Sequence, residues 1–83
     1  MTLRELLYTC MDVKLEVNIY KNWTYSPDKE TECVKTVEGD TTTLAVNFSL
    51  KRYGDFDYEK LNVFYIGYKN KGQTLRVNCE VKE

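Results

Sequence analysis

Strict alternation between apolar and polar side chains is the feature that most restricts what this chain can fold into. The alternation runs through residues 13–20 and again through residues 75–82. Successive side chains of a β-strand point to opposite faces of a sheet, so the pattern predicts two strands with one buried face. Residues 61–68 are also rich in strand-forming side chains, and residues 69–72 have the composition of a hairpin loop. Both faces of the segment 61–68 are apolar, which favours a central place in the sheet.

The N-terminus carries the local signals of a helix. Thr2 and Glu5 stand three residues apart and fit a capping box. Apolar side chains from Leu3 to Cys10 recur at the spacing of one helical face. We therefore expect a short helix over about residues 3–10, which is stable only when it docks on the rest of the domain.

Two further strands complete the expected sheet. One covers residues 33–37, and the other covers residues 42–50, where apolar residues alternate again, although this segment could partly coil. Residues 21–32 and 51–60 are expected to form connections. One helix and four or five mostly antiparallel strands predict a single α+β domain over residues 1–83, with the helix packed on one face of the sheet.

Composition favours binding over catalysis. The chain has no histidine, which removes the side chain best suited to proton transfer near neutral pH and the commonest metal ligand. It has seven tyrosines, which supply stiff, amphipathic contact surface. The acidic run 55–59 starts like a calcium loop, but Lys60 and Ile66 stand where that loop needs glycine and glutamate. The four glycines form no phosphate-binding pattern. We expect no enzyme activity, no metal site and no cofactor.

The three cysteines, Cys10, Cys33 and Cys79, are too few and too widely spaced for a disulfide framework or a zinc site. They are expected to be small, half-buried core thiols, with a single bridge between Cys33 and Cys79 as the alternative. The polar opening of the chain contains no signal-peptide core, and no apolar run reaches the length of a membrane span. These features predict a reduced, cytoplasmic protein that does not enter a membrane.

Charge is distributed unevenly but weakly. Residues 1–40 carry five Lys or Arg against eight Asp or Glu, and residues 41–83 carry seven against five. This imbalance is far from the basic surface expected of a protein that binds duplex nucleic acid. The segment 52–58 resembles the aromatic strand of an RNA recognition motif, but two aspartates in it would repel phosphate.

Aromatic side chains near cations form the candidate binding surface. Such groups are typical of the energetically important centre of protein interfaces, with cations at the rim. The alternative is that the aromatic rings cover the edge of the core with their hydroxyls in water. The candidate partner-binding residues are Trp23, Tyr25, Tyr53, Phe56, Tyr58 and Tyr68, with Lys51, Arg52, Lys69 and Lys71 at the rim.

Several of these segments together resemble a recurrent pattern. The opening Thr2–Leu7, the acidic Asp12, the alternating Val13–Val17 and the late Tyr53–Asp55 before a hairpin are similar to small accessory proteins of phages and integrated elements of bacteria. Some such proteins are anti-CRISPR or other counter-defence factors. The resemblance implies a non-enzymatic inhibitor of a bacterial defence system, which acts in the host cytoplasm by binding the surface of a host protein.

Two other functions fit the same residues. One is a small-ligand binder, such as a sponge for a cyclic nucleotide, in which tyrosines stack on the base and Arg52, Lys69 or Lys71 meets phosphate. The other is a structural module that self-associates through an exposed strand edge, for example as a homodimer.

Overall fold

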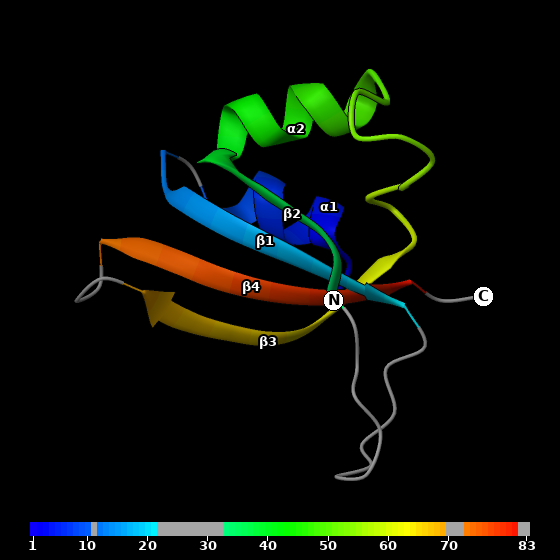
Figure 1. Ribbon diagram of the computed structural model, residues 1–83. Coiled ribbons are helices and arrows are strands. Elements are labelled where there is room, and N and C mark those ends of the chain that lie inside the picture. The colour runs from blue at the N-terminus through cyan, green and yellow to red at the C-terminus, as the bar shows by residue number, and fades with distance from the viewer. Residues whose placement is uncertain (11, 22–32, 70–72, 82–83) are drawn as a thin grey trace, which may run out of the picture.

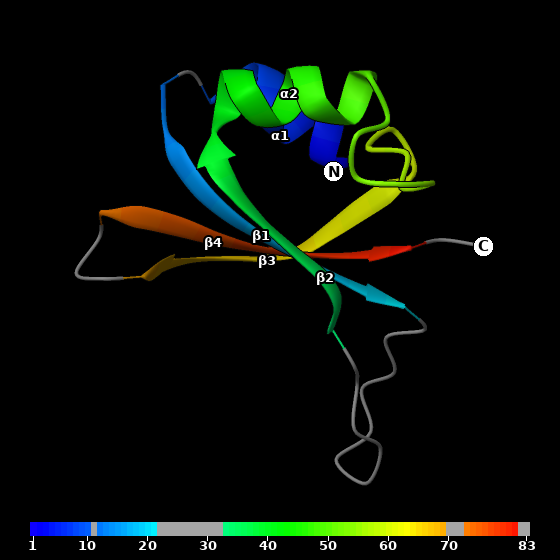
Figure 2. The ribbon, with the colours of Figure 1, turned by 45° about the horizontal axis from the view of Figure 1, so that its top comes forward.

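The computed structural model describes residues 1–10, 12–21, 33–69 and 73–81. Two helices cover one face of a four-stranded sheet (Figures 1 and 2), which confirms the α+β class. The expected helix and four of the five expected strands are present, and a second helix takes the place of the fifth strand. In chain order the elements are α1 (Leu3–Thr9), β1 (Lys14–Lys21), β2 (Cys33–Asp40), α2 (Thr41–Ser49), β3 (Leu61–Lys69) and β4 (Thr74–Val81).

The sheet is mixed, with strand order β2-β1-β4-β3. β1 pairs with β2 and β3 pairs with β4 in antiparallel fashion, while the central pair β1 and β4 is parallel. The expectation that β3 is central was wrong, because β3 forms one edge of the sheet and β2 the other. Leu61 at the start of β3 is buried, but the apolar side chains farther along the strand are not: Tyr65, Ile66 and Tyr68 are exposed.

The core lies between the sheet and the two helices. Leu15, Val17 and Ile19 of β1 are fully buried, as the alternation predicts, and the same face continues on β4 with Val77 and Cys79. The remaining buried apolar side chains are Leu3, Leu6, Leu7, Val37, Leu44, Phe48 and Leu61.

Helix α1 begins as the capping box predicts. Thr2 is the N-cap, and its side-chain oxygen accepts a hydrogen bond from the backbone N–H of Glu5 at 3.2 Å. The backbone carbonyl of Met1 accepts from the N–H of Val63 at 2.8 Å, and Thr2 forms an isolated bridge with Asn62. The start of the chain is thereby tied to the first part of β3.

The expectation of a strand over residues 42–50 was wrong, because this segment forms α2. Asp40 is the N-cap, and its carboxylate accepts a hydrogen bond from a backbone N–H of the first turn at 2.7 Å. Leu44 and Phe48 are four residues apart and both are buried, whereas Val46 is exposed. The alternation of apolar residues is misleading here, because only those at helical spacing reach the core.

Candidate functional site

Three of the candidate aromatic residues pack on the core. The rings of Tyr53 and Tyr58 lie 4.8 and 5.9 Å from the ring of Phe48, and Phe56 is also half-buried against the core. The hydroxyl of Tyr53 accepts a hydrogen bond from the side-chain amide of Asn47 at 2.8 Å. These rings cover the end of the core beside α2, which is the alternative that the sequence left open.

Two of the candidate cations terminate α2. Lys51 has a left-handed backbone conformation with a φ of 56°, and its N–H donates to the carbonyl of Phe48 at 3.1 Å. The N–H of Arg52 donates to the carbonyl of Asn47 at 2.9 Å. This pair of bonds is a Schellman motif, in which glycine is the usual residue at the position of Lys51. The side chains of Lys51 and Arg52 are exposed, but the backbone conformation of both serves the helix end.

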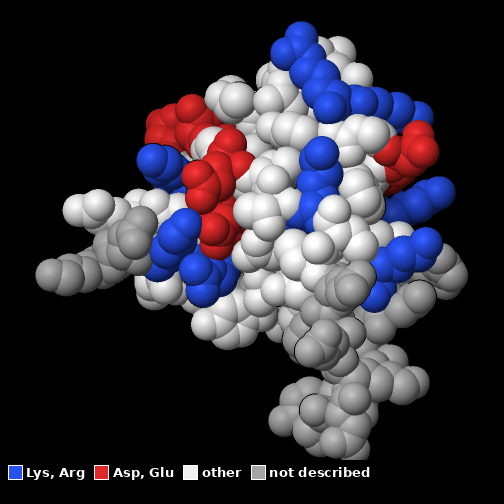
Figure 3. Space-filling model, viewed as in Figure 1, with Lys and Arg blue, Asp and Glu red and all other residues white. Residues whose placement is uncertain are grey.

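Lys69 belongs to an ion-pair network on the sheet face that the helices leave uncovered. Its ammonium lies 2.8 Å from one carboxylate oxygen of Glu16 and 3.3 Å from Glu38. Arg76 lies 2.8 Å from the other oxygen of Glu16. Figure 3 shows acidic and basic side chains side by side rather than one large patch of a single sign. The ammonium of Lys69 is therefore paired with two carboxylates. A cation that binds phosphate would need an ammonium without such partners.

The network changes the acidity of its members. Hydrogen bonds from Lys69 and Arg76 hold the pKa of Glu16 at about 2, although the carboxylate is buried. Hydrogen bonds to Glu16, and to a lesser degree to Glu38, raise the pKa of Lys69. Asn18 extends the network, since its amide donates to Glu16 at 3.4 Å and to Asn78 at 3.1 Å. Sequence reasoning missed Glu16 and Arg76, which are ordinary polar positions in an alternating pattern.

Of the four remaining candidates, one lies at an exposed strand end and three lie outside the described residues. Tyr68, at the far end of β3, is 76% exposed, more than any other large apolar or aromatic residue described. Tyr65 and Ile66 are exposed beside it. Trp23, Tyr25 and Lys71 lie outside the described residues. The seven candidates among the described residues thus do not form one surface.

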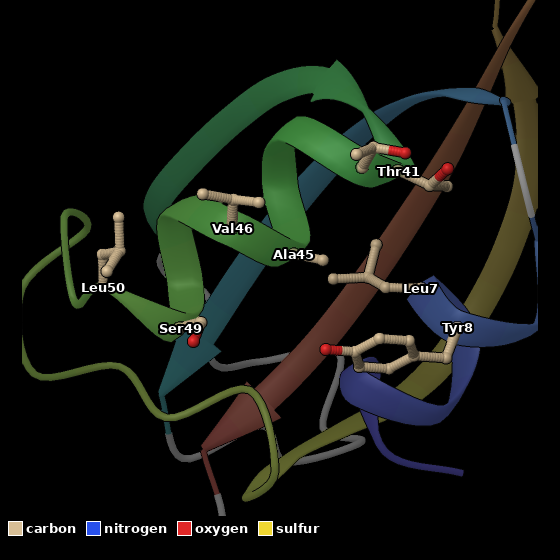
Figure 4. Close-up of a pocket in the computed structure, with 8 residues that line it drawn as sticks. Leu7, Tyr8, Thr41, Ala45, Val46, Ser49 and Leu50 are labelled. Carbon is tan, nitrogen blue, oxygen red and sulfur yellow. The ribbon is translucent and has the colours of Figure 1, made fainter.

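An apolar groove between α1 and α2 is the feature that the sequence did not predict. Figure 4 shows Leu7 and Tyr8 projecting from α1 toward α2, across from Ala45. The groove has a volume of about 450 Å³. None of the described residues that line it is charged: they are Leu7, Tyr8, Thr41, Thr42, Ala45, Val46, Ser49 and Leu50. We call this feature the interhelix groove.

Apolar side chains stand exposed around the interhelix groove. Tyr8, Val46 and Leu50 are each about half exposed or more. The buried hydroxyl of Thr41, at the start of α2, has no hydrogen-bond partner among the described residues. The groove could not be found from the sequence because one of its two walls was assigned to a strand.

The three cysteines are free and occupy different environments. Cys79 is buried, and burial raises the pKa of its thiol to about 12. Cys10 is half-buried and Cys33 is exposed, so Cys33 is not the core thiol expected, and the alternative bridge to Cys79 is not formed. The described part of the chain contains no group of three or more Cys, Asp or Glu placed to hold a metal ion. No helix in that part is both long and apolar enough to span a membrane.

Comparisons of the chain with protein-family models, with curated proteins and with solved structures found no match.

Proposed function

We propose that this protein is a non-enzymatic interaction protein that binds a partner protein through the interhelix groove. The observation that carries the proposal is an uncharged groove of about 450 Å³ with Tyr8, Val46 and Leu50 exposed at its margin. Large apolar side chains around a concave surface are typical of sites that take up apolar side chains of another protein.

An amphipathic helix or a pair of apolar anchors is the kind of segment that an apolar groove between two helices can take up. Its walls are two helices of 7 and 9 residues lying on the same face of the sheet (Figure 2). A partner would insert apolar side chains between Leu7 on α1 and Ala45 on α2, and would cover Val46 at the margin. Burial of Val46 and of the partner's own apolar side chains removes apolar surface from water, which favours association by about 25 cal/mol per Å² before the costs of binding.

The biological setting of the proposal comes from the resemblance to phage and mobile-element accessory proteins. On that basis we propose that the partner is a bacterial host protein, in the first place a component of a defence system that the chain inhibits. A nucleotide sponge finds less support, because the described lining of the groove has no cation and Lys69 is held by Glu16 and Glu38.

The test is a groove-dependent capture experiment. Tagged wild-type protein is exposed to bacterial lysate, the captured protein is identified and purified, and its Kd for the wild type is measured. The variants Val46→Glu and Leu50→Glu place a carboxylate at the margin of the groove without touching the core. We expect each to weaken binding at least tenfold, because a charge would have to be desolvated in an apolar contact.

The matched control is Val34→Glu on β2. Val34 is 46% exposed and Val46 is 49% exposed, so the same substitution is made at equal exposure, but Val34 does not line the groove. Binding by this control should equal that of the wild type. Equal affinities for the wild type, Val46→Glu and Leu50→Glu, or no groove-dependent partner in the lysate, would contradict the proposal.

A further inference from the structure

Part of one sheet edge is open and apolar. The N-terminal segment covers the outer edge of β3 at Asn62 and Val63, through the bridge from Thr2 and the hydrogen bond from Val63 to Met1. The rest of β3, from Tyr65 to Lys69, has no strand or segment paired on its outer side within the described chain. An uncovered edge offers unpaired backbone N–H and C=O groups to another strand.

The two edges of the sheet differ in character. The outer strand β2 carries charged side chains at Lys35, Glu38 and Asp40, the kind of residue that discourages pairing with another strand. The open part of β3 has one charged side chain, Lys69, which is held by Glu16 and Glu38, and it exposes Ile66 and Tyr68 by 47% and 76%. The β2 edge exposes one large apolar side chain, Val34. Strand addition is therefore favoured at β3.

The side chains of β3 are sorted by face. Ile66 pairs with Val77 and Tyr68 with Leu75, so both lie on the face that bears the helices. After the bulge between Val63 and Tyr65, the side chain of Tyr65 lies on the opposite face. A Cβ placed on Gly67 would lie 2.8 Å from atoms of the Tyr65 ring, which shows that this ring extends along the strand over Gly67.

We infer that a second copy of this chain pairs with the open part of β3 in antiparallel fashion, with the two-fold axis at Gly67. In this register Ile66 of each copy lies opposite Tyr68 of the other copy. The four side chains form one apolar cluster. Tyr65 lies opposite Lys69 on the other face, where each Tyr65 ring extends over the Gly67 of its own strand. The two Gly67 residues face each other at the axis, and because glycine has no side chain, each leaves room on that face for the Tyr65 ring of its own strand.

This pairing is self-complementary, which is what a closed two-fold dimer requires. A two-fold axis perpendicular to the sheet joins the two sheets into one of eight strands and keeps both helical layers on the same side. If the proposed function holds, the dimer presents two interhelix grooves in the same direction. A partner with two equivalent sites would then be bound with avidity.

The oligomeric state tests the inference without any partner. Sedimentation equilibrium of the wild type, from about 10 µM to about 1 mM, should show a reversible monomer–dimer equilibrium, weak because the contact is small. Reductant is present throughout, since the exposed Cys33 could otherwise form a disulfide-linked dimer. Amide NMR signals recorded over the same dilution series should shift at Tyr65–Lys69 and not along β2.

Two single variants and their combination test the register. Ile66→Lys and Tyr68→Glu should each weaken dimerisation at least tenfold, and their exposed positions should leave the fold intact by circular dichroism. In the double variant each lysine at position 66 lies opposite the glutamate at position 68 of the other copy. This variant should dimerise at least threefold more tightly than either single variant. A strictly monomeric wild type, single variants that dimerise like the wild type, or shifts along β2 would overturn the pairing. A double variant no tighter than the single variants would overturn the register. Failure of the capture experiment would leave these results unaffected, so the two proposals fail separately.

Discussion

Replacement of Glu16 by glutamine is expected to destabilise the protein in a way that depends on pH. Lys69 and Arg76 hold the pKa of Glu16 at about 2, against an ordinary value of 4.5. This difference corresponds to a ceiling of about 3.4 kcal/mol, at about 1.36 kcal/mol for each pKa unit. The side chains of Lys69 and Arg76 are 29% and 45% exposed, so screening by water reduces the expected loss at pH 7 to about 1–2 kcal/mol.

The direction of the pH dependence follows from the lower pKa of Glu16 in the folded state. Its contribution to the free energy of unfolding is fully present above the unfolded value of 4.5, and it is lost as pH falls toward 2. By pH 3 the contribution should fall to about 40% of its value at pH 7. Glutamine does not titrate, so the stability curves of the wild type and Glu16→Gln should converge on acidification.

Urea unfolding at pH 7, 5, 4 and 3 measures this convergence. The control is Glu59→Gln, which removes a carboxylate that lies 3.3 Å from Arg4, in a pair whose side chains are both at least half exposed. An exposed ion pair contributes about 0–1 kcal/mol, so this control should change little. A gap between the wild type and Glu16→Gln that stays constant from pH 7 to pH 3 would refute the argument.

Three further predictions concern the core, a helix end and the thiols. Leu44→Ala removes a fully buried side chain of α2 and should lower the free energy of unfolding by about 2–5 kcal/mol in urea titrations; a loss below about 1 kcal/mol would contradict the assignment of Leu44 to the core. Lys51→Gly should raise the free energy of unfolding by about 0.5–1 kcal/mol, because glycine adopts the left-handed conformation without steric cost; a destabilised variant in the same titration would count against the Schellman motif. In the native protein at pH 8, Cys33 should react with a thiol reagent and Cys79 should not, since Cys79 is buried and its pKa is raised to about 12; modification of Cys79 at the rate of Cys33, seen by peptide mapping, would exclude the buried position.

Most of the fold could be predicted from local patterns. The alternation in β1 and β4 indicates which face of each strand meets the core. The capping box of α1 indicates where that helix begins. α2 escaped prediction because its apolar residues satisfy both periods: Leu44 and Phe48 are separated by four residues, which is compatible with a strand and with a helix. The deciding signal was Asp40, an N-cap residue directly before the segment.

The candidate site could be predicted only in part. Composition identified the aromatic residues, but it could not say which of them the fold would bury. Tyr53 and Tyr58 pack on Phe48, a contact that exists only because residues 51–60 fold back against α2. Tyr68 remained exposed because β3 is an edge strand, and strand order depends on long-range pairing that no local pattern specifies.

The distribution of polar groups explains why two apolar surfaces remain open. The sheet face away from the helices is closed by its own network, in which the charges of Glu16, Lys69 and Arg76 satisfy one another. Within the described residues, two short helices lie over four strands, so the space between α1 and α2 and the end of β3 stay uncovered. A chain of this size can bury only about 60–65% of its unfolded surface, and apolar groups left over must lie somewhere. Apart from Met1 and Val34, the exposed large apolar side chains of the described residues are gathered at the groove and at the end of β3. Gathered apolar surface is what a second protein can cover.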